Sequence, residues 1–241
     1  MNQQINFTLS LADTTLILAQ RNSEWCAHGP ILEQDIAITN ISLDLLGQAR
    51  NFYQHAAHLI GSPATEDSLA YLRTEREFKN LLITELPNGD WAQTILRQFF
   101  FSVYQSLLYT QLLQSKDEQL AAIAEKSLKE ITYHIKWSSD WVIRLGDGTA
   151  ESQQRMYKAI EYLWMYTGEF FIPADYETTD LSAMEREWSL KVKDVFEEAG
   201  LIMPEKIFMQ QGGKTGNHTE HLGFILAEMQ SLQRTYPGAQ W

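Results

Sequence analysis

The sequence is short of cysteine, of basic residues and of long apolar runs, and each shortage excludes a class of protein. One cysteine, Cys26, among 241 residues excludes an intrachain disulfide framework and multi-cysteine zinc or iron–sulfur sites. Lys and Arg number 19 against 31 Asp and Glu, and the formal net charge of −12 argues against nucleic acid or an anionic membrane as partner. No apolar run approaches the roughly 20 residues that span a bilayer, and the N-terminus lacks the basic region of a secretory signal. We therefore expect an acidic, soluble protein of the cytoplasm.

Proline and glycine are also scarce, and they gather at a few breaks that leave long segments between them. Within these segments apolar residues recur every three or four positions, as they do from Ile38 through Leu45 and Phe52 to Leu59, which is typical of amphipathic helices. No comparable stretch alternates strictly, as a strand would. The spacing predicts eight helices, over residues 6–22, 31–60, 67–86, 91–115, 118–145, 151–171, 181–199 and 218–236.

The helix boundaries carry their own signals. Asp90 and Asp117 stand where N-cap residues would, and Gly61 and Gly200 stand where helices would end. The helix around Phe99 is apolar on most sides and should be central. Helices of this length are about 40 Å long, and four of them make a long bundle with the others packed around it. We expect a single all-α domain over residues 1–241, with surface loops at residues 173–180 and 201–217.

A long four-helix bundle invites a test for a di-iron site. Di-iron carboxylate proteins take one Glu from each of two helices and a Glu-x-x-His from each of the other two. The residue three positions before each histidine is Trp, Phe, His, Ile, Thr or His, so no Glu-x-x-His or Asp-x-x-His occurs. The histidines tested are His28, His55, His58, His134, His218 and His221. A di-iron site of this composition is therefore excluded.

Three other groups of polar residues match a metal site only in part, and structural roles are favoured for them. Glu130 and His134 lie four residues apart on one helix, where they could pair inside the bundle or at its edge. Asp44 is the one carboxylate of a polar stripe on another helix, and Gly47, three residues later, cannot ligate. Two His-x-x-His pairs lack the two further ligands that a structural zinc site needs; they are His55/His58 and His218/His221.

Aromatic residues are plentiful, with 7 Trp, 10 Tyr and 11 Phe. A thin bundle cannot hide so many large side chains, and aromatic residues are enriched in the cores of interfaces. Part of this set is therefore expected to meet another subunit. A thick core of eight helices is the alternative that composition leaves open.

Several segments resemble the PaaC-type subunit of bacterial phenylacetyl-CoA oxygenases, and the resemblance runs from about residue 7 to Trp241. The segments are LADT at residues 11–14, SEWCAHGP at 23–30, LDLLGQARN at 43–51, HTEHLG at 218–223, LAEMQ at 226–230 and PGAQW at 237–241. The resemblance implies a ferritin-like fold. It also implies membership of a multicomponent monooxygenase that converts phenylacetyl-CoA to its ring 1,2-epoxide in aerobic phenylacetate degradation.

In the family that these segments resemble, the chemistry belongs to other subunits. A related subunit of the PaaA type holds the di-iron site and binds the CoA thioester. A bridging subunit and a reductase with flavin and an iron–sulfur centre complete the electron path from NADPH. The resemblance implies that this chain pairs tightly with the PaaA-type subunit as its structural partner and binds no cofactor itself. Whether the isolated chain forms a homodimer is a question that the resemblance leaves open.

The resemblance also indicates which positions correspond to the sister subunit's metal ligands. Two of four carboxylates remain, and neither histidine position holds histidine, so it implies no metal and no catalytic residue in this chain. Asp44, Glu130 and the adjacent His134 would then be buried polar groups that satisfy one another. The corresponding positions are Thr15, Asp44, Gly47, Phe101, Ser102, Glu130 and Tyr133.

Two alternatives remain beside this interpretation. One is a self-contained ferritin-like oxygenase that uses Asp44, Glu130 and His134 in an unfamiliar site. The other is a helical adaptor that is unrelated to oxygen chemistry.

Overall fold

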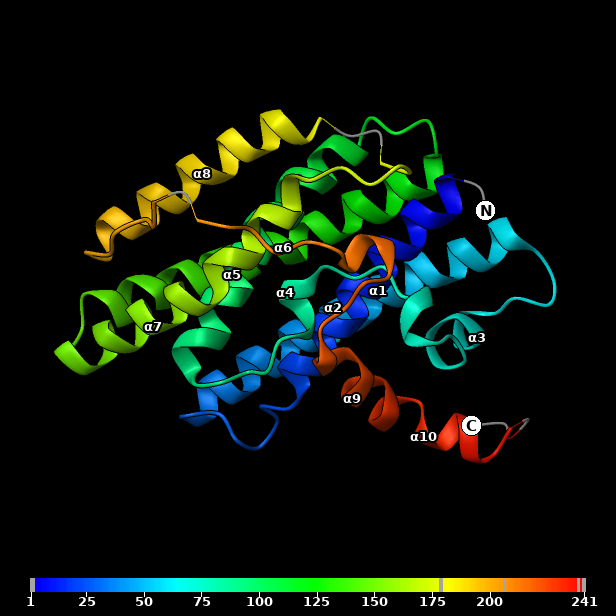
Figure 1. Cartoon of the computed structure of the whole chain (residues 1–241), viewed down its shortest axis with the longest axis horizontal. Coiled ribbons are helices and arrows are strands. Elements are labelled where there is room, and N and C mark those ends of the chain that lie inside the picture. Colours follow the sequence, from blue (N-terminus) through cyan, green and yellow to red (C-terminus); the bar gives the residue numbers. More distant parts are fainter. Residues whose placement is uncertain (1–2, 178–179, 206, 238, 240–241) are drawn as a thin grey trace. The chain divides into compact units, whose positions relative to one another are not determined.

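A computed structural model describes residues 3–177, 180–205, 207–237 and 239 (Figure 1). Thr178 and Thr179 of the predicted loop at 173–180, residue 206 of the loop at 201–217, and Gly238 and Trp241 of the closing segment lie outside the described residues. Every regular element in the described part of the chain is a helix. The predicted class, an all-α protein with the long helices of a ferritin-like bundle, is therefore confirmed. None of the helices that these residues form is long and apolar enough to cross a membrane.

The chain divides into two compact units. Unit 1 comprises Met1–Pro87, Ala174–Glu177 and Gly212–Trp241, and unit 2 comprises Asn88–Pro173 and Thr178–Gln211. Each unit therefore takes segments from distant parts of the sequence. The single domain over residues 1–241 stays a prediction.

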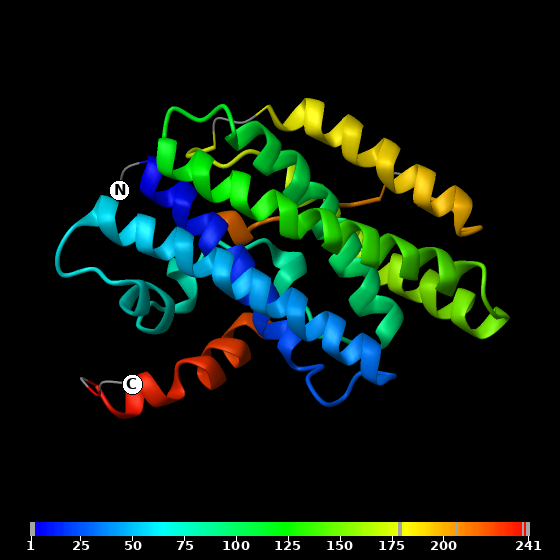
Figure 2. The same ribbon diagram turned by 180° about the vertical axis from the view of Figure 1, so that it is seen from behind.

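Unit 1 is built on a pair of long helices, α1 (Gln3–Ser23) and α2 (Leu32–Ile60), which pack along each other (Figures 1 and 2). Both helices carry fully buried apolar side chains, among them Leu9, Ile17, Ile38, Leu45 and Phe52. Shorter elements complete the unit, of which α3 contacts α2 and α4 contacts α1. They are α3 (Glu66–Tyr71), η1 (Glu75–Glu77), α4 (Leu82–Glu85), η3 (Gly213–Thr215), α9 (Glu220–Met229) and α10 (Ser231–Thr235).

Unit 2 is built around α5 (Trp91–Leu112), which contacts α6 (Glu118–Gly146), α7 (Ala150–Thr167) and α8 (Leu181–Glu198). The 3-10 helix η2 (Gly168–Phe171) continues from α7. Asp90 caps α5 and Asp117 caps α6 through their side chains, as the sequence predicts. Phe100 of α5 is fully buried against Trp164 and Trp188. The prediction that this helix is central is therefore confirmed within unit 2.

Two of the predicted helices are interrupted in the structure, so the prediction that each is continuous is wrong. The predicted helix at 67–86 is broken into α3, η1 and α4, because the Arg73 side chain turns toward α1 and Thr74 begins a new turn that Glu77 caps. The predicted helix at 218–236 ends at Met229 and resumes at Ser231. There the Gln230 side chain donates to the carbonyl oxygens of Ala70 and Arg73 instead of pointing to solvent.

The two predicted surface loops are only partly on the surface. Tyr176 and Lys214 are buried in unit 1, where the Tyr176 hydroxyl donates to the Lys214 carbonyl oxygen and the Lys214 ammonium pairs with Glu177 at 2.9 Å. A Cβ on Gly213 would lie 2.2 Å from the carbonyl oxygen of Asn80, so this close approach requires glycine. The prediction holds better for residues 202–205 and 207–211, where Phe208 is largely exposed.

Candidate functional site

A densely hydrogen-bonded polar group in unit 1 surrounds the carboxylate of Asp13, which is completely buried in α1. One carboxylate oxygen accepts a hydrogen bond from the Tyr53 hydroxyl of α2 at 2.6 Å. The other accepts from the backbone N–H of Lys79 at 2.8 Å. The Arg73 guanidinium donates to both oxygens, so the pair is bidentate.

The remaining hydrogen-bonding capacity of Arg73 is also used. Its Nε donates to the carbonyl oxygen of Leu69, and one terminal nitrogen donates to that of Glu77 at 3.0 Å. Burial has the largest single effect on the pKa of the guanidinium and lowers it, but the charge of Asp13, its hydrogen bond and the nearby Tyr53 and Glu77 together outweigh burial and raise the pKa. Burial, followed by the charge of Asp13, raises the pKa of Tyr53 well above its ordinary value. Both states, charged Arg73 and neutral Tyr53, are therefore fixed by the fold.

A second buried group joins α4 to the start of α9. The Glu85 carboxylate accepts from Asn80 at 2.8 Å and from the backbone N–H of Thr219 at 2.6 Å, and it contacts His218 Nδ1 at 2.9 Å. His218 Nε2 lies 3.0 Å from the carbonyl oxygen of Phe78. Both ring nitrogens thus face acceptors, and an imidazolium satisfies both because each nitrogen then donates. His218 therefore serves as an anchor for the C-terminal helices.

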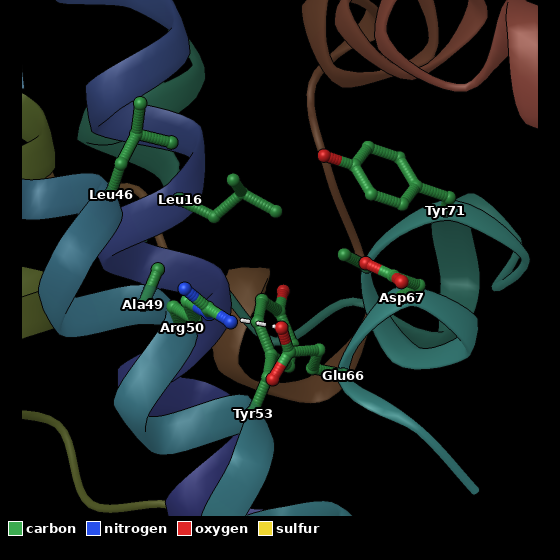
Figure 3. A pocket seen from close by; sticks show the side chains of 9 residues that line it. Leu16, Leu46, Ala49, Arg50, Tyr53, Glu66, Asp67 and Tyr71 are labelled. Carbon is green, nitrogen blue, oxygen red and sulfur yellow. Dashed lines mark hydrogen bonds and ion pairs between the residues drawn. The ribbon is translucent and has the colours of Figure 1, made fainter. Parts of the chain in front are cut away.

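A pocket of about 200 Å³ opens between α2 and α3 (Figure 3). Leu16, Leu46 and Ala49 form an apolar wall on one side, with Asp67 and Tyr71 of α3 across from it. Arg50 of α2 bridges to Glu66 of α3 at 3.0 Å. Burial raises the pKa of Tyr71, and the charge of Asp67 raises it further. The pocket thus has an apolar interior and an acidic edge.

The positions that the sequence relates to metal ligands are divided between the two units. In unit 1, Thr15 is buried and its hydroxyl donates to the carbonyl oxygen of Leu11 at 2.8 Å. Asp44 is half-buried on α2. Gly47 lies on an exposed face of the same helix, where a Cβ would have no neighbour within 4 Å.

In unit 2, Phe101 and Ser102 are buried on α5, and the Ser102 hydroxyl accepts from Gln98 at 2.8 Å. On α6, Glu130 is half-buried and His134 is completely buried, whereas Tyr133 is 47% exposed. Burial raises the pKa of Tyr109 on α5, the hydrogen bond from Gln105 opposes this, and the charge of Glu130 adds to the rise. Glu130 is thus close enough to α5 to act on a buried tyrosine.

These residues do not fit a pair of iron ions. Gly47 offers no ligand atom and Phe101 offers only carbon, while Tyr133 turns away from the core of its unit. Across the described residues, no three His, Cys, Asp or Glu side chains are grouped so that they could hold a metal ion. That the chain holds neither metal nor catalytic residues stays a prediction.

The Asp13 and Glu85 groups were not predicted from the sequence. A carboxylate within the otherwise uncharged segment of residues 8–19 is a usable signal, because a buried charge requires a partner. The partner's identity gives no such signal, since Arg73 lies 60 residues away and His218 lies 133 residues from Glu85. Both groups are saturated with hydrogen bonds, and this arrangement suits rigid anchoring.

Comparison with known proteins defines the class to which this all-α chain belongs. Residues 1–241 match the family model for PaaA and PaaC, described as phenylacetic acid catabolic protein, so the chain belongs to that family. A relative in Escherichia coli (strain K12) is named as one of the subunits of 1,2-phenylacetyl-CoA epoxidase, the one designated C. It is 47% identical over 249 residues, covering 100% of both chains. The resemblance to PaaC-type subunits is therefore confirmed over the full length.

Proposed function

We propose that this chain is a non-catalytic structural subunit of a phenylacetyl-CoA 1,2-epoxidase complex in aerobic phenylacetate catabolism. It pairs tightly with a PaaA-type sister subunit that carries the di-iron site and the substrate. A bridging subunit and an NADPH-dependent reductase with flavin and an iron–sulfur centre deliver the electrons. The chain is 47% identical over its full length to a protein named as a subunit of such an epoxidase, and this supports its membership of an epoxidase complex.

The observation that supports a structural role is that Gly47 and Tyr133 are not histidines. Both stand where the sister pattern requires histidine, and glycine has no side chain to ligate. Their faces on α2 and α6 are exposed within their own units. A chain with these residues contributes to catalysis only through its partner.

The role that suits such a subunit is to hold the sister's helices in place. A metal site requires ligands fixed within about 0.5 Å by the packing around them. Residues that orient the ligands are part of that requirement. A rigid helical partner supplies this support by burying apolar surface of the sister's helices on assembly.

Reconstitution of the complex tests the proposal. Phenylacetyl-CoA-dependent NADPH oxidation and epoxide formation are measured with the sister, bridging and reductase components, with and without this chain. We expect turnover only when the chain is present, and we expect iron in the sister subunit alone.

Two results would contradict the proposal. Stoichiometric iron in this chain, retained after mild chelation, would indicate a self-contained oxygenase. Full epoxidation without the chain, or failure to co-purify with the sister, would indicate an adaptor that is unrelated to oxygen chemistry.

A further inference from the structure

The outer face of α2 carries a stripe of exposed apolar side chains. Leu32, Ile36 and Leu43 are 72%, 51% and 60% exposed. At 3.6 residues per turn, these three residues, Gly47 and Arg50 fall within about 60° of the helix circumference. The opposite side of the helix is buried in unit 1. A single exposed leucine is ordinary, but an apolar row on one helix marks a site of interaction.

Gly47 lies one turn beyond Leu43 in this stripe, and no contact within the chain requires glycine there. Its backbone is not in the left-handed region, and a Cβ would meet no atom within 4 Å. Glycine in the interior of a helix destabilises it by roughly 0.5–1 kcal/mol relative to alanine. The residue that α2 itself favours here is therefore alanine. Glycine is explained when another backbone approaches the helix at this point.

The pocket between α2 and α3 lies at the end of the stripe, because Leu46, Ala49 and Arg50 belong to both α2 and the pocket. Its edge holds two carboxylates, Glu66 and Asp67, against the one guanidinium of Arg50. Arg50 is already paired with Glu66, so the edge retains one uncompensated negative charge. An apolar interior with an acidic edge suits a lysine or arginine side chain, whose stem is apolar and whose head is cationic.

We propose that the outer face of α2, from Leu32 to Arg50, and the adjoining pocket form the surface on which the catalytic sister subunit docks. A helix of the sister crosses α2 at Gly47, and the pocket accepts a lysine or arginine side chain of the sister. The inference rests on the proposed function, which supplies the partner. Charge complementarity supplies its chemistry, because a chain of net charge −12 with an acidic pocket favours a basic contact.

Binding measurements on four variants test the docking surface. The dissociation constant of the complex with purified sister subunit is determined for Gly47→Leu and Leu43→Asp. Two matched controls lie on other helices: Ala122→Leu on an exposed face of α6, and Leu190→Asp on α8, where Leu190 is 62% exposed. We expect at least roughly 100-fold weaker binding for the two α2 variants, as for other central interface residues. The two controls should bind like the wild type.

Folding is controlled independently of docking. The Cβ of Gly47→Leu meets no atom of its own chain within 4 Å and the position is exposed, so the isolated variant should melt no lower than the wild type. Gly47→Ala should melt slightly higher and bind more weakly. The pocket is tested by Asp67→Lys, for which we expect about 10-fold weaker binding and a smaller dependence of affinity on salt.

The failures of the two proposals can be told apart. If the wild-type chain docks and Gly47→Leu and Leu43→Asp dock equally well, the docking surface is wrong while the proposed function stands. If these variants dissociate a homodimer but still bind the sister, the occupant is a second copy and the inference is overturned. If the wild-type chain does not bind the sister, the proposed function fails and the docking surface fails with it.

Discussion

A buried carboxylate is tolerated only when its partners are fixed around it, and Asp13 has three of them. Tyr53, Arg73 and the backbone of Lys79 come from three different segments of unit 1. The group therefore ties α1 to α2 and to the chain after α3 with charge-assisted hydrogen bonds. Such bonds are stronger than neutral ones, and they make the loss of any one partner severe.

Replacing Arg73 with methionine should destabilise the chain severely. Arg73→Met leaves Asp13 charged and buried without its counter-ion, a change that typically costs about 3–5 kcal/mol. The unfolding free energy from urea titration measures the loss. The double variant Asp13→Leu, Arg73→Met removes both charges and should recover part of it. Purely additive losses would show that the two side chains are not coupled as the structure indicates.

The buried tyrosines should make the chain sensitive to alkaline pH. Burial raises the pKa of Tyr109, so the native state keeps a proton that the unfolded chain releases near pH 10. Stability from this group is therefore complete below about pH 10 and falls as the pH rises above it. Tyr109→Phe should show a smaller fall in unfolding free energy between about pH 8 and about pH 11. The exposed Tyr236→Phe is the control, and an equal fall in all three proteins would contradict the prediction.

The long helices are the elements that local pattern predicts well. The periodic run from Ile38 to Leu59 became α2, and Asp90 and Asp117 cap α5 and α6 as expected. Their boundaries depend on neighbours in sequence, which a periodic pattern records. Asp44 and Glu130 lie on long helices, but both are half-buried where the sequence predicts buried groups, and their correspondence to metal ligands stays a prediction.

The breaks depend on contacts that no local pattern records. Residues 67–86 have helical spacing, yet Arg73 leaves the helix to reach Asp13, 60 residues earlier in the chain. Residues 218–236 break because Gln230 caps the carbonyl groups at the end of α3. In both segments a tertiary hydrogen bond outweighs helix propensity, which amounts to less than about 1 kcal/mol per residue.

The α9–α10 segment should loosen when its anchor at Glu85 is removed. Glu85→Ala removes the acceptor of His218 and of the Thr219 N–H, so the start of α9 loses its attachment to α4. Amide hydrogen exchange should rise in residues 218–229 and stay unchanged in α5 and α6. The matched control is Glu228→Ala, whose side chain is exposed on α9. Faster exchange throughout both units would instead indicate global destabilisation.

The whole chain combines an acidic surface with apolar faces that its own units leave exposed. Among the described residues, exposed large apolar side chains occur in both units, with Leu43 on α2 and Phe208 of unit 2 as examples. A net charge far from zero favours solubility of an isolated chain, and the apolar face of α2 is suited to burial on assembly. A subunit of this kind should therefore affect turnover through assembly and not through chemistry.

Substitution of Asp44 and Glu130 tests whether the chain affects turnover through assembly. Asp44→Leu and Glu130→Leu should lower the melting temperature or the yield of assembled complex, because both half-buried side chains have polar surroundings that leucine cannot satisfy. Epoxidation per assembled complex should stay within about twofold of the wild type, since the proposed function places the reacting atoms in the sister subunit and gives this chain no catalytic residue. Glu125→Leu, at an exposed position of α6, is the control for loss of charge. A loss of about a thousandfold in turnover per assembled complex, with melting and assembly unchanged, would place these residues in the chemistry and contradict the structural role.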